Sequence, residues 1–238
     1  MTDDSLLGRL RALDTCAVSD ALDHLGIAGA TTGIRPMWGR PKIAGRARTV
    51  EVADAAAGPA GRHLATSAVQ ASGPGDVLVI ANRGRTDVSC WGDILTAAAQ
   101  YRGIEGTVID GACRDLDAVA GAGFPVYARA AVPVTARGRL AERGCDIPVV
   151  FDGVLVSSAD LVLADGSGVV FLPAGRAAEI IEAAERLARR QEAMLAAIRA
   201  GEPVTEVMHD SRFRAALSGP APAGPVPAGP GAPCEKDR

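Results

Sequence analysis

The first part of the chain combines helical and strand-like patterns of apolar residues. Residues 5–13 carry leucines on one helical face, so a helix is predicted there. A second helix is predicted from Ser19, a suitable N-cap, to Gly26, a suitable helix end. Residues 43–52 alternate between apolar and polar side chains, which is typical of a strand with one exposed face. The chain therefore begins with two helices and then enters a sheet.

Short apolar strands alternate with helices in the middle of the chain. The predicted strands cover residues 77–80, 107–109 and 126–128, and the predicted helices cover 92–101 and 115–120. Asp110-Gly111 is predicted to be the turn that follows the second of these strands. This alternation is typical of an α/β domain.

The pattern changes to consecutive strands between residues 148 and 173, with turns at Asp152-Gly153 and at 165–168. A long amphipathic helix is then predicted over 174–200, followed by a short helix over 206–217. Strands that first alternate with helices and then run together predict a layered α/β fold with a mixed central sheet and a long C-terminal helix.

Residues 218–238 differ from the rest because prolines alternate with alanine and glycine. Such a segment lacks side chains that form a core, so we expect a disordered tail. The remaining residues, 1–217, are expected to form a single domain, because a chain of 238 residues holds one large domain or two small ones.

Composition excludes several classes of protein. Apolar residues make up 48% of the chain, enough to form a core. The 25 basic side chains are balanced by 28 acidic ones, which argues against nucleic-acid binding through a basic face. No apolar stretch approaches the roughly 18–20 residues of a membrane helix, and the first residues do not resemble a secretory signal. With five widely spaced cysteines, a disulfide framework is not indicated, and we expect a cytoplasmic protein.

Common catalytic and cofactor motifs are missing from the sequence. It contains no glycine-rich dinucleotide fingerprint and no P-loop. Lys42 and Lys236 are its only lysines, which disfavours a Schiff-base mechanism. Cys113, beside Arg114, is a candidate nucleophile, but a small buried thiol next to a turn is the simpler interpretation. The three histidines show no spacing typical of metal ligands, so we interpret them as surface or packed residues.

Two segments carry a pattern that points to chemistry: residues 91–95 and residues 110–115, each where a loop enters a predicted helix. A helix N-terminus offers free N–H groups that bind anions. Arg114 can hold a carboxylate through two hydrogen bonds. Asp93 and Asp115 supply oxygen ligands suited to Mg²⁺ or Mn²⁺. The simpler alternative is that both aspartates only stabilise helix N-termini and that Arg114 is an exposed charge.

At these residues the chain resembles the RraA-like superfamily, and most closely its 4-hydroxy-4-methyl-2-oxoglutarate (HMG)/4-carboxy-4-hydroxy-2-oxoadipate (CHA) aldolases. The shared pattern is an aspartate followed, after residues 94–113, by Arg-Asp, present here as Asp93 and Arg114-Asp115. Supporting blocks occur in order between residues 19 and 217, at 75–79, 103–111, 123–126 and 164–171.

The resemblance implies an α/β sandwich that assembles as a homotrimer or homohexamer with active sites between subunits. It also implies that the loop Gly92-Asp93-Ile94-Leu95 binds the pyruvyl carboxylate through backbone N–H groups. The third residue of the loop is Ile94 where the family has leucine, and residues 53–63 lack an asparagine found in many relatives.

For catalysis, the resemblance implies that Arg114 binds substrate and that Asp115 ligates a divalent metal directly. Asp93 would hold metal-bound water and assist proton transfer. Glu192, on the C-terminal helix of a neighbouring subunit, would complete the metal's water shell; Glu182 and Glu185 share that helix.

The activity implied is that of a metal-dependent pyruvate aldolase. Such an enzyme cleaves a 4-hydroxy-2-oxo acid of the HMG/CHA type to pyruvate and a second oxo compound, and decarboxylates oxaloacetate as a side reaction. The alternative is an RraA-type regulator without catalytic activity that binds an endoribonuclease.

Overall fold

The computed structural model describes residues 3–55 and 63–209. Contacts divide the chain into one unit over residues 1–188 and a second over 189–238, and each is described here by itself. The tail predicted at 218–238 lies outside the described residues, as do residues 210–217 of the short helix predicted at 206–217. Among the described residues this helix covers Val204–Val207 and does not continue through 208–209, so it begins earlier than predicted and ends at Val207. A single domain over 1–217 stays a prediction.

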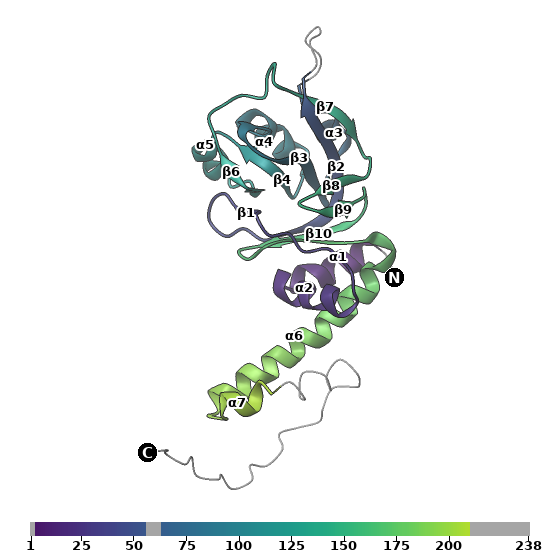
Figure 1. The fold of residues 1–238 in the computed structure, drawn as a ribbon, viewed down its shortest axis with the longest axis vertical. Helices are drawn as coiled ribbons and strands as arrows, with labels where there is room; N and C mark the ends of the chain where they lie inside the picture. Colours follow the sequence, from purple (N-terminus) through teal and green to yellow (C-terminus); the bar gives the residue numbers. More distant parts are fainter. Residues whose placement is uncertain (1–2, 56–62, 210–238) are drawn as a thin grey trace, which may run out of the picture. The chain divides into compact units, whose positions relative to one another are not determined.

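A mixed sheet forms the centre of the first unit (Figure 1), which confirms the predicted fold class. Its strands run in the order β1-β5-β4-β3-β2-β10-β11, with β6 beside β4 and β7 beside β2. Strands β2, β3, β4 and β5 pair in parallel, whereas β1, β7, β10 and β11 pair antiparallel. Two further strands, β8 and β9, form a separate hairpin. The strands are β1 Arg35–Pro36, β2 Ile43–Asp54, β3 Asp76–Ser89, β4 Gly106–Cys113, β5 Val126–Ala128, β6 Ala130–Ala131, β7 Leu140–Cys145, β8 Val149–Phe151, β9 Val154–Val156, β10 Leu161–Asp165 and β11 Gly168–Leu172.

A helix lies near each predicted one, but the starts of α2 and α7 differ from the prediction, and the sequence analysis missed a short helix, α3. The helices are α1 Asp3–Ala12, α2 Thr15–His24, α3 Thr66–Ala71, α4 Asp93–Tyr101, α5 Leu116–Gly121, a 3-10 turn at Ala174–Arg176, α6 Ala177–Arg199 and α7 Val204–Val207. No helix in the described part of the chain combines the length and the apolar character needed to cross a membrane.

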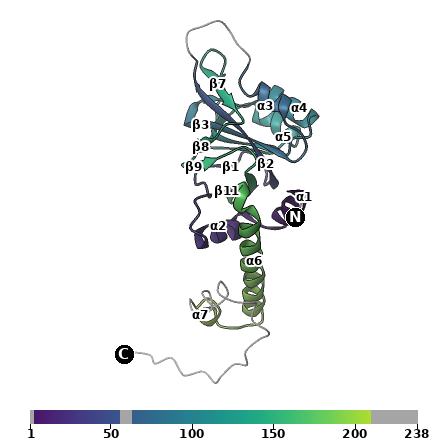
Figure 2. The same cartoon turned by 90° about the vertical axis from the view of Figure 1, so that its right-hand side faces the viewer.

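The sheet is buried on both faces, which explains why the start of β3 reads as a continuous apolar run. Figure 2 shows helices α3, α4 and α5 gathered on one side of the sheet. The β8–β9 hairpin contributes to the core of the opposite face. The first core includes Leu78, Ile80, Ile109, Val69, Leu95 and Val119, and the second includes Val77, Val79, Val108, Phe151, Val156 and Phe171.

Two local predictions were wrong. Helix α2 begins at Thr15, before the predicted N-cap Ser19, because the Asp14 side chain accepts a hydrogen bond from the Ala17 N–H (2.7 Å) and caps the helix there. Asp110-Gly111 is not a turn but lies within β4, because the parallel ladder with β3 continues past Ile109. The site-bearing loop therefore begins after Cys113.

A partly buried ion network fastens the β8–β9 hairpin to the sheet. Arg129 donates from Nε to Asp110 (2.6 Å) and from a terminal nitrogen to Asp152, in the hairpin turn. Asp152 also accepts from the Thr32 N–H (2.7 Å). Burial alone would raise the pKa of Asp152, but the hydrogen bonds from Thr32 and Arg129 outweigh it and lower the pKa below its usual value.

We expect Asp152→Asn to lower the free energy of unfolding at neutral pH by about 1–3 kcal/mol, because a charge-assisted partner of Arg129 is lost. The pKa of Asp152 is lower in the folded state, so its contribution is present above the unfolded pKa near ~4 and disappears as pH falls through the folded pKa. In urea unfolding measured as a function of pH, the free energy of unfolding of the variant should fall less steeply with decreasing pH than that of the wild type. Exposed Asp23→Asn serves as the control, and equal acid profiles for Asp152→Asn and wild type would contradict the assignment.

Candidate active site

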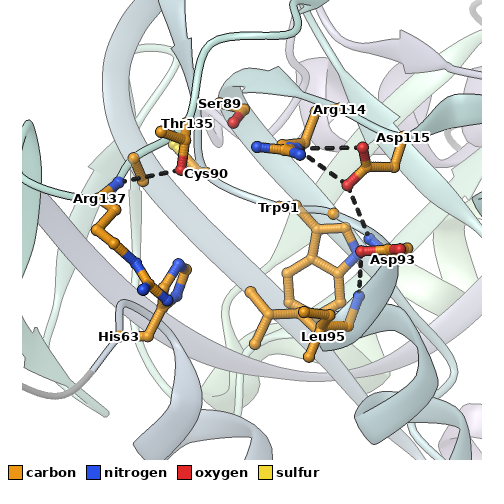
Figure 3. A pocket seen from close by; sticks show the side chains of 13 residues that line it. His63, Ser89, Cys90, Trp91, Asp93, Leu95, Arg114, Asp115, Thr135 and Arg137 are labelled. Carbon is orange, nitrogen blue, oxygen red and sulfur yellow. Dashed lines mark hydrogen bonds and ion pairs between the residues drawn. The ribbon is translucent and has the colours of Figure 1, made fainter.

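The two loops singled out by the sequence meet at the carboxyl ends of β3 and β4. They line one cavity of about 210 Å³, shown in Figure 3. Parallel pairing of the two strands places both ends at the same edge of the sheet, where α/β proteins bind ligands. The lining residues are His63, Ser89, Cys90, Trp91, Gly92, Asp93, Ile94, Leu95, Arg114, Asp115, Thr135, Ala136 and Arg137.

Trp91 holds the β3–α4 loop in place. Its ring is 2% exposed and stacks on Phe124 with centroids 6.0 Å apart. Its indole N–H donates to Thr96 Oγ1 (2.8 Å), in the first turn of α4. The Trp91 carbonyl accepts from the Arg114 N–H (2.9 Å), so this loop is tied directly to the β4–α5 loop. The two halves of the site are therefore fixed relative to each other.

Asp115 adopts a conformation that favours the pocket over its own helix. It occupies the N-cap position of α5, yet its side chain makes no capping hydrogen bond. Its φ of 57° lies in the left-handed region, which is costly for a residue other than glycine and is common at functional sites. The carboxylate turns towards Gly92 instead, where a Cβ would lie 2.6 Å from Asp115 Oδ2. Helix capping alone thus does not explain Asp115.

The N-terminus of α4 is occupied by protein carboxylates. The Asp93 N–H donates to Asp115 Oδ2 (3.3 Å), and the Ile94 N–H donates to Asp93 Oδ1 (2.7 Å). These donors belong to the loop expected to bind the pyruvyl carboxylate. Anionic oxygens already lie on them, which supports an anion-binding role for this helix end.

Arg114 contacts Asp115 and keeps part of its guanidinium available. Its Nε donates to both carboxylate oxygens of Asp115, at 3.0 and 3.2 Å. Its two terminal nitrogens make no hydrogen bond to any described residue. The Arg114 side chain is 37% exposed, at the wall of the cavity. The free edge of the guanidinium can therefore hold a ligand carboxylate through two hydrogen bonds.

The carboxylates of Asp93 and Asp115 fit a hydrated Mg²⁺ or Mn²⁺. Both line the cavity, and the 27% exposure of Asp115 leaves its carboxylate accessible. No cluster of three or more metal-ligating side chains occurs among residues 3–55 and 63–209. Mg²⁺ tolerates such a site because it is often held by one or two carboxylates while water or substrate supplies the other ligands.

Glu192 belongs to the second unit and is exposed on α6. The other glutamates considered for the same role are engaged within the first unit: Glu182 pairs with Arg186 (3.0 Å), and Glu185 pairs with Arg9 (2.7 Å). Within the described residues Glu192 forms no ion pair.

The cysteine interpretation is also clarified. Burial raises the pKa of the Cys90 thiol to about 12 and that of the Cys113 thiol to about 12, so both stay protonated at neutral pH. Cys113 is buried within β4. A protonated, buried thiol is a poor nucleophile, which agrees with a packing role.

The sequence analysis missed the wall formed by His63, Thr135 and Arg137. No local motif marks these residues. The segment at 134–137 reaches the cavity because Ser89, at the end of β3, donates from its N–H (2.9 Å) and its hydroxyl (2.7 Å) to the Val134 carbonyl. Only a long-range contact of this kind could have identified them.

Solved structures share this architecture. The crystal structure of an uncharacterized protein from Pseudomonas syringae superimposes with a TM-score of 0.78 at 33% identity, covering 86% of this chain and 96% of that one. Streptomyces coelicolor RraAS2, described as an unusual member of the RNase ES inhibitor RraA protein family, has a TM-score of 0.74 at 29% identity, covering 80% of this chain and 96% of that one.

Proteins of similar sequence match most of the length of this chain. A Halalkalibacterium halodurans protein with the provisional name 4-hydroxy-4-methyl-2-oxoglutarate aldolase is 32% identical over 191 residues, covering 80% of this chain and 87% of that protein. Protein DlpA of Legionella pneumophila is 29% identical over 209 residues, which are 88% of this chain but only 34% of DlpA. The chain thus spans about a third of the length of DlpA and most of the length of the Halalkalibacterium protein.

The RraA-like family model, described as Aldolase/RraA, matches residues 15–171 and so includes both site-bearing loops. This match confirms the resemblance identified from the sequence, and the chain belongs to the RraA-like family.

Proposed function

We propose that this protein is a divalent-metal-dependent pyruvate aldolase. It would cleave a 4-hydroxy-2-oxo acid of the HMG/CHA type to pyruvate and a second oxo compound. The observation that carries the proposal is the cavity at the ends of β3 and β4, where the free edge of Arg114 and the N-terminus of α4 face one space. The provisional aldolase name of the Halalkalibacterium relative supports the same choice.

In this proposal, two groups bind the pyruvyl end of the substrate. The N–H groups at the start of α4 donate hydrogen bonds to its carboxylate, which takes the place of the Asp93 side chain. The terminal nitrogens of Arg114 lie beside the 2-oxo group and stabilise the negative charge that develops there. Both groups are held by the loop contacts of Trp91, so they are positioned before the substrate binds.

Cleavage requires removal of the C4 hydroxyl proton. We assign this step to Asp93, acting through water, since its carboxylate is exposed at the cavity. As the C3–C4 bond breaks, its electron pair passes to the pyruvyl fragment, which leaves as an enolate and takes up a proton at C3. Decarboxylation of oxaloacetate yields the same enolate, so this side activity is expected.

A divalent metal would be held by Asp115 directly and by Asp93 through water, and when bound it would supply Lewis-acid stabilisation of the 2-oxo oxygen. We further propose a homotrimer or homohexamer in which Glu192 of a neighbouring subunit contributes to the water shell. Its exposure and its lack of an ion pair among the described residues support this role.

An RraA-type regulator that binds an endoribonuclease is the second candidate, favoured by the likeness to Streptomyces RraAS2. Such a role places no chemical demand on Arg114 or Asp115. Capture of an endoribonuclease by a protein without metal-dependent lyase activity would favour it over the aldolase.

We expect EDTA to abolish pyruvate release from 4-hydroxy-4-methyl-2-oxoglutarate, and Mg²⁺ or Mn²⁺ to restore it, measured with a coupled lactate dehydrogenase assay. Arg114→Lys should lower kcat/KM by about 10- to 100-fold, because the single ammonium of lysine cannot place two N–H donors at the pyruvyl end as the terminal nitrogens of Arg114 do. Arg176→Lys, on an exposed ion pair with Glu179, is the matched control. Full activity in EDTA or in Arg114→Lys would refute the mechanism.

We expect Gly92→Ala to lower kcat/KM by about 10- to 100-fold, because the new Cβ would lie 2.6 Å from Asp115 Oδ2 and displace that carboxylate. Backbone strain is not the cause, since φ at Gly92 is −160°, which any residue adopts. Gly121→Ala on α5, where a Cβ meets nothing within 4 Å, should leave activity unchanged. Steady-state kinetics and thermal unfolding of both variants test this prediction. If Gly92→Ala had the kinetics of the wild type, the close approach of the Asp115 carboxylate to residue 92 would not be needed for activity.

A further inference from the structure

The backbone just before α3 is held in an unfavourable conformation. Ala65 has a φ of 63°, in the left-handed region, although alanine has no polar side chain to compensate for the strain there. Both Ala65 and Leu64 are buried, and both belong to the core on the helix side of the sheet. Such a conformation persists only where surrounding contacts hold it, and it is common at functional sites.

Those contacts come from a strand that is distant in the sequence. Glu142 on β7 accepts hydrogen bonds from the Ala65 N–H (2.9 Å) and from the Ser67 hydroxyl. The Thr66 hydroxyl donates to the carbonyl of His63 (2.7 Å). These bonds fix the turn into α3, and with it the position of His63 at the cavity.

The imidazole of His63 lines the cavity across from Arg114, Asp93 and Asp115 (Figure 3). Its Nδ1 lies 3.2 Å from the Leu64 carbonyl oxygen. Because a carbonyl oxygen only accepts, Nδ1 carries a proton in this contact. The residue is exposed, and its Nε2 has no hydrogen bond to residues 3–55 or 63–209. Nε2 is therefore free to exchange a proton with a ligand in the cavity.

The other groups on this side of the cavity are poor proton carriers. The hydroxyls of Ser89 and Thr135 are hydrogen-bonded to backbone groups. Burial raises the pKa of the Cys90 thiol to about 12. The guanidinium of Arg137 keeps its proton. An imidazole, by contrast, both gives and accepts a proton near neutral pH, which singles out His63 among these residues.

We propose that His63 is the catalytic residue that gives a proton to C3 of the pyruvyl enolate. The inference rests on the proposed aldolase function, in which Arg114 and the N-terminus of α4 hold the carboxylate and the 2-oxo group. C3 then extends from that end towards the opposite wall. The cavity of about 210 Å³ is small, so a ligand that fills it contacts both walls.

The proton transfer balances within the proposed reaction. The electron pair of the enolate forms the new C3–H bond with the Nε2 proton of the His63 imidazolium, and the ring becomes neutral. The proton that Asp93 removes from the C4 hydroxyl through water replaces the one given to C3. Cleavage therefore leaves both residues in their starting protonation states, with no net gain or loss of protons.

Exchange of the methyl protons of pyruvate with D₂O isolates this step, because it passes through the same enolate without a C3–C4 bond. Proton NMR on the full-length protein with Mg²⁺ should show exchange by the wild type. His63→Gln should slow the exchange by about 100-fold, since an amide forms hydrogen bonds but does not accept the proton. Added imidazole should restore part of the exchange in His63→Ala, where the shorter side chain leaves room for it.

Two measurements separate proton transfer from binding and folding. Pyruvate affinity, measured by titration calorimetry, should change by less than about twofold in His63→Gln, and thermal unfolding should match the wild type. His24→Gln is the matched control, because His24 is exposed on α2 and does not line the cavity. It should exchange pyruvate protons at the wild-type rate.

The outcomes distinguish this inference from the proposed function. Wild-type exchange in His63→Gln, or a loss of exchange fully explained by weaker pyruvate binding, would overturn the role of His63 and leave the aldolase standing. A wild-type protein with Mg²⁺ that neither exchanges pyruvate protons nor releases pyruvate from 4-hydroxy-4-methyl-2-oxoglutarate would refute the proposed function, and the role of His63 with it. Slow exchange with intact binding and rescue by imidazole would support the assignment.

Discussion

The parallel pairing of β3 with β4 is the constraint on which the rest of the site depends. It brings two loops that are separated by a helix in sequence to one edge of the sheet. The hydrogen bond from the Arg114 N–H to the Trp91 carbonyl then joins them, and the buried Trp91 ring fixes the pair against the core. Without this pairing, the acidic residues and Arg114 would be isolated features of two separate helix starts.

The left-handed conformation of Asp115 depends on this arrangement. A non-glycine residue at φ 57° is unfavourable, so the surrounding contacts must hold it there. Arg114 Nε binds the carboxylate, and the missing Cβ of Gly92 leaves the space into which it turns. The strained backbone of Asp115 and the absence of a side chain at Gly92 therefore both serve to place the Asp115 carboxylate. Together they present an oxygen ligand and the open edge of a guanidinium to one cavity.

Much of the fold could be predicted because hydrophobic periodicity records which faces are buried. The strands at 126–128 and 169–172 and the long helix near 177–199 follow this rule. The start of α2 was wrong because its local cap, Asp14, was not recognised. The error in β4 has another cause, since the pattern does not reveal long-range pairing. Asp110-Gly111 reads as a turn by composition, yet the ladder with β3 carries β4 through it. Likewise α3 and the short edge strands depend on neighbours that are distant in sequence.

By itself, the sequence determined the fold class and the family, and it marked Asp93 and Arg114-Asp115 as candidate site residues. These features can be read from residue types and from the spacing between them along the chain. Only the tertiary structure decided that Asp115 turns away from its own helix and that Arg137 reaches the opposite wall of the same cavity. The physical reason is that these positions result from packing between distant segments. Ser89 binding the Val134 carbonyl brings Arg137 to the site, and no local pattern encodes that contact.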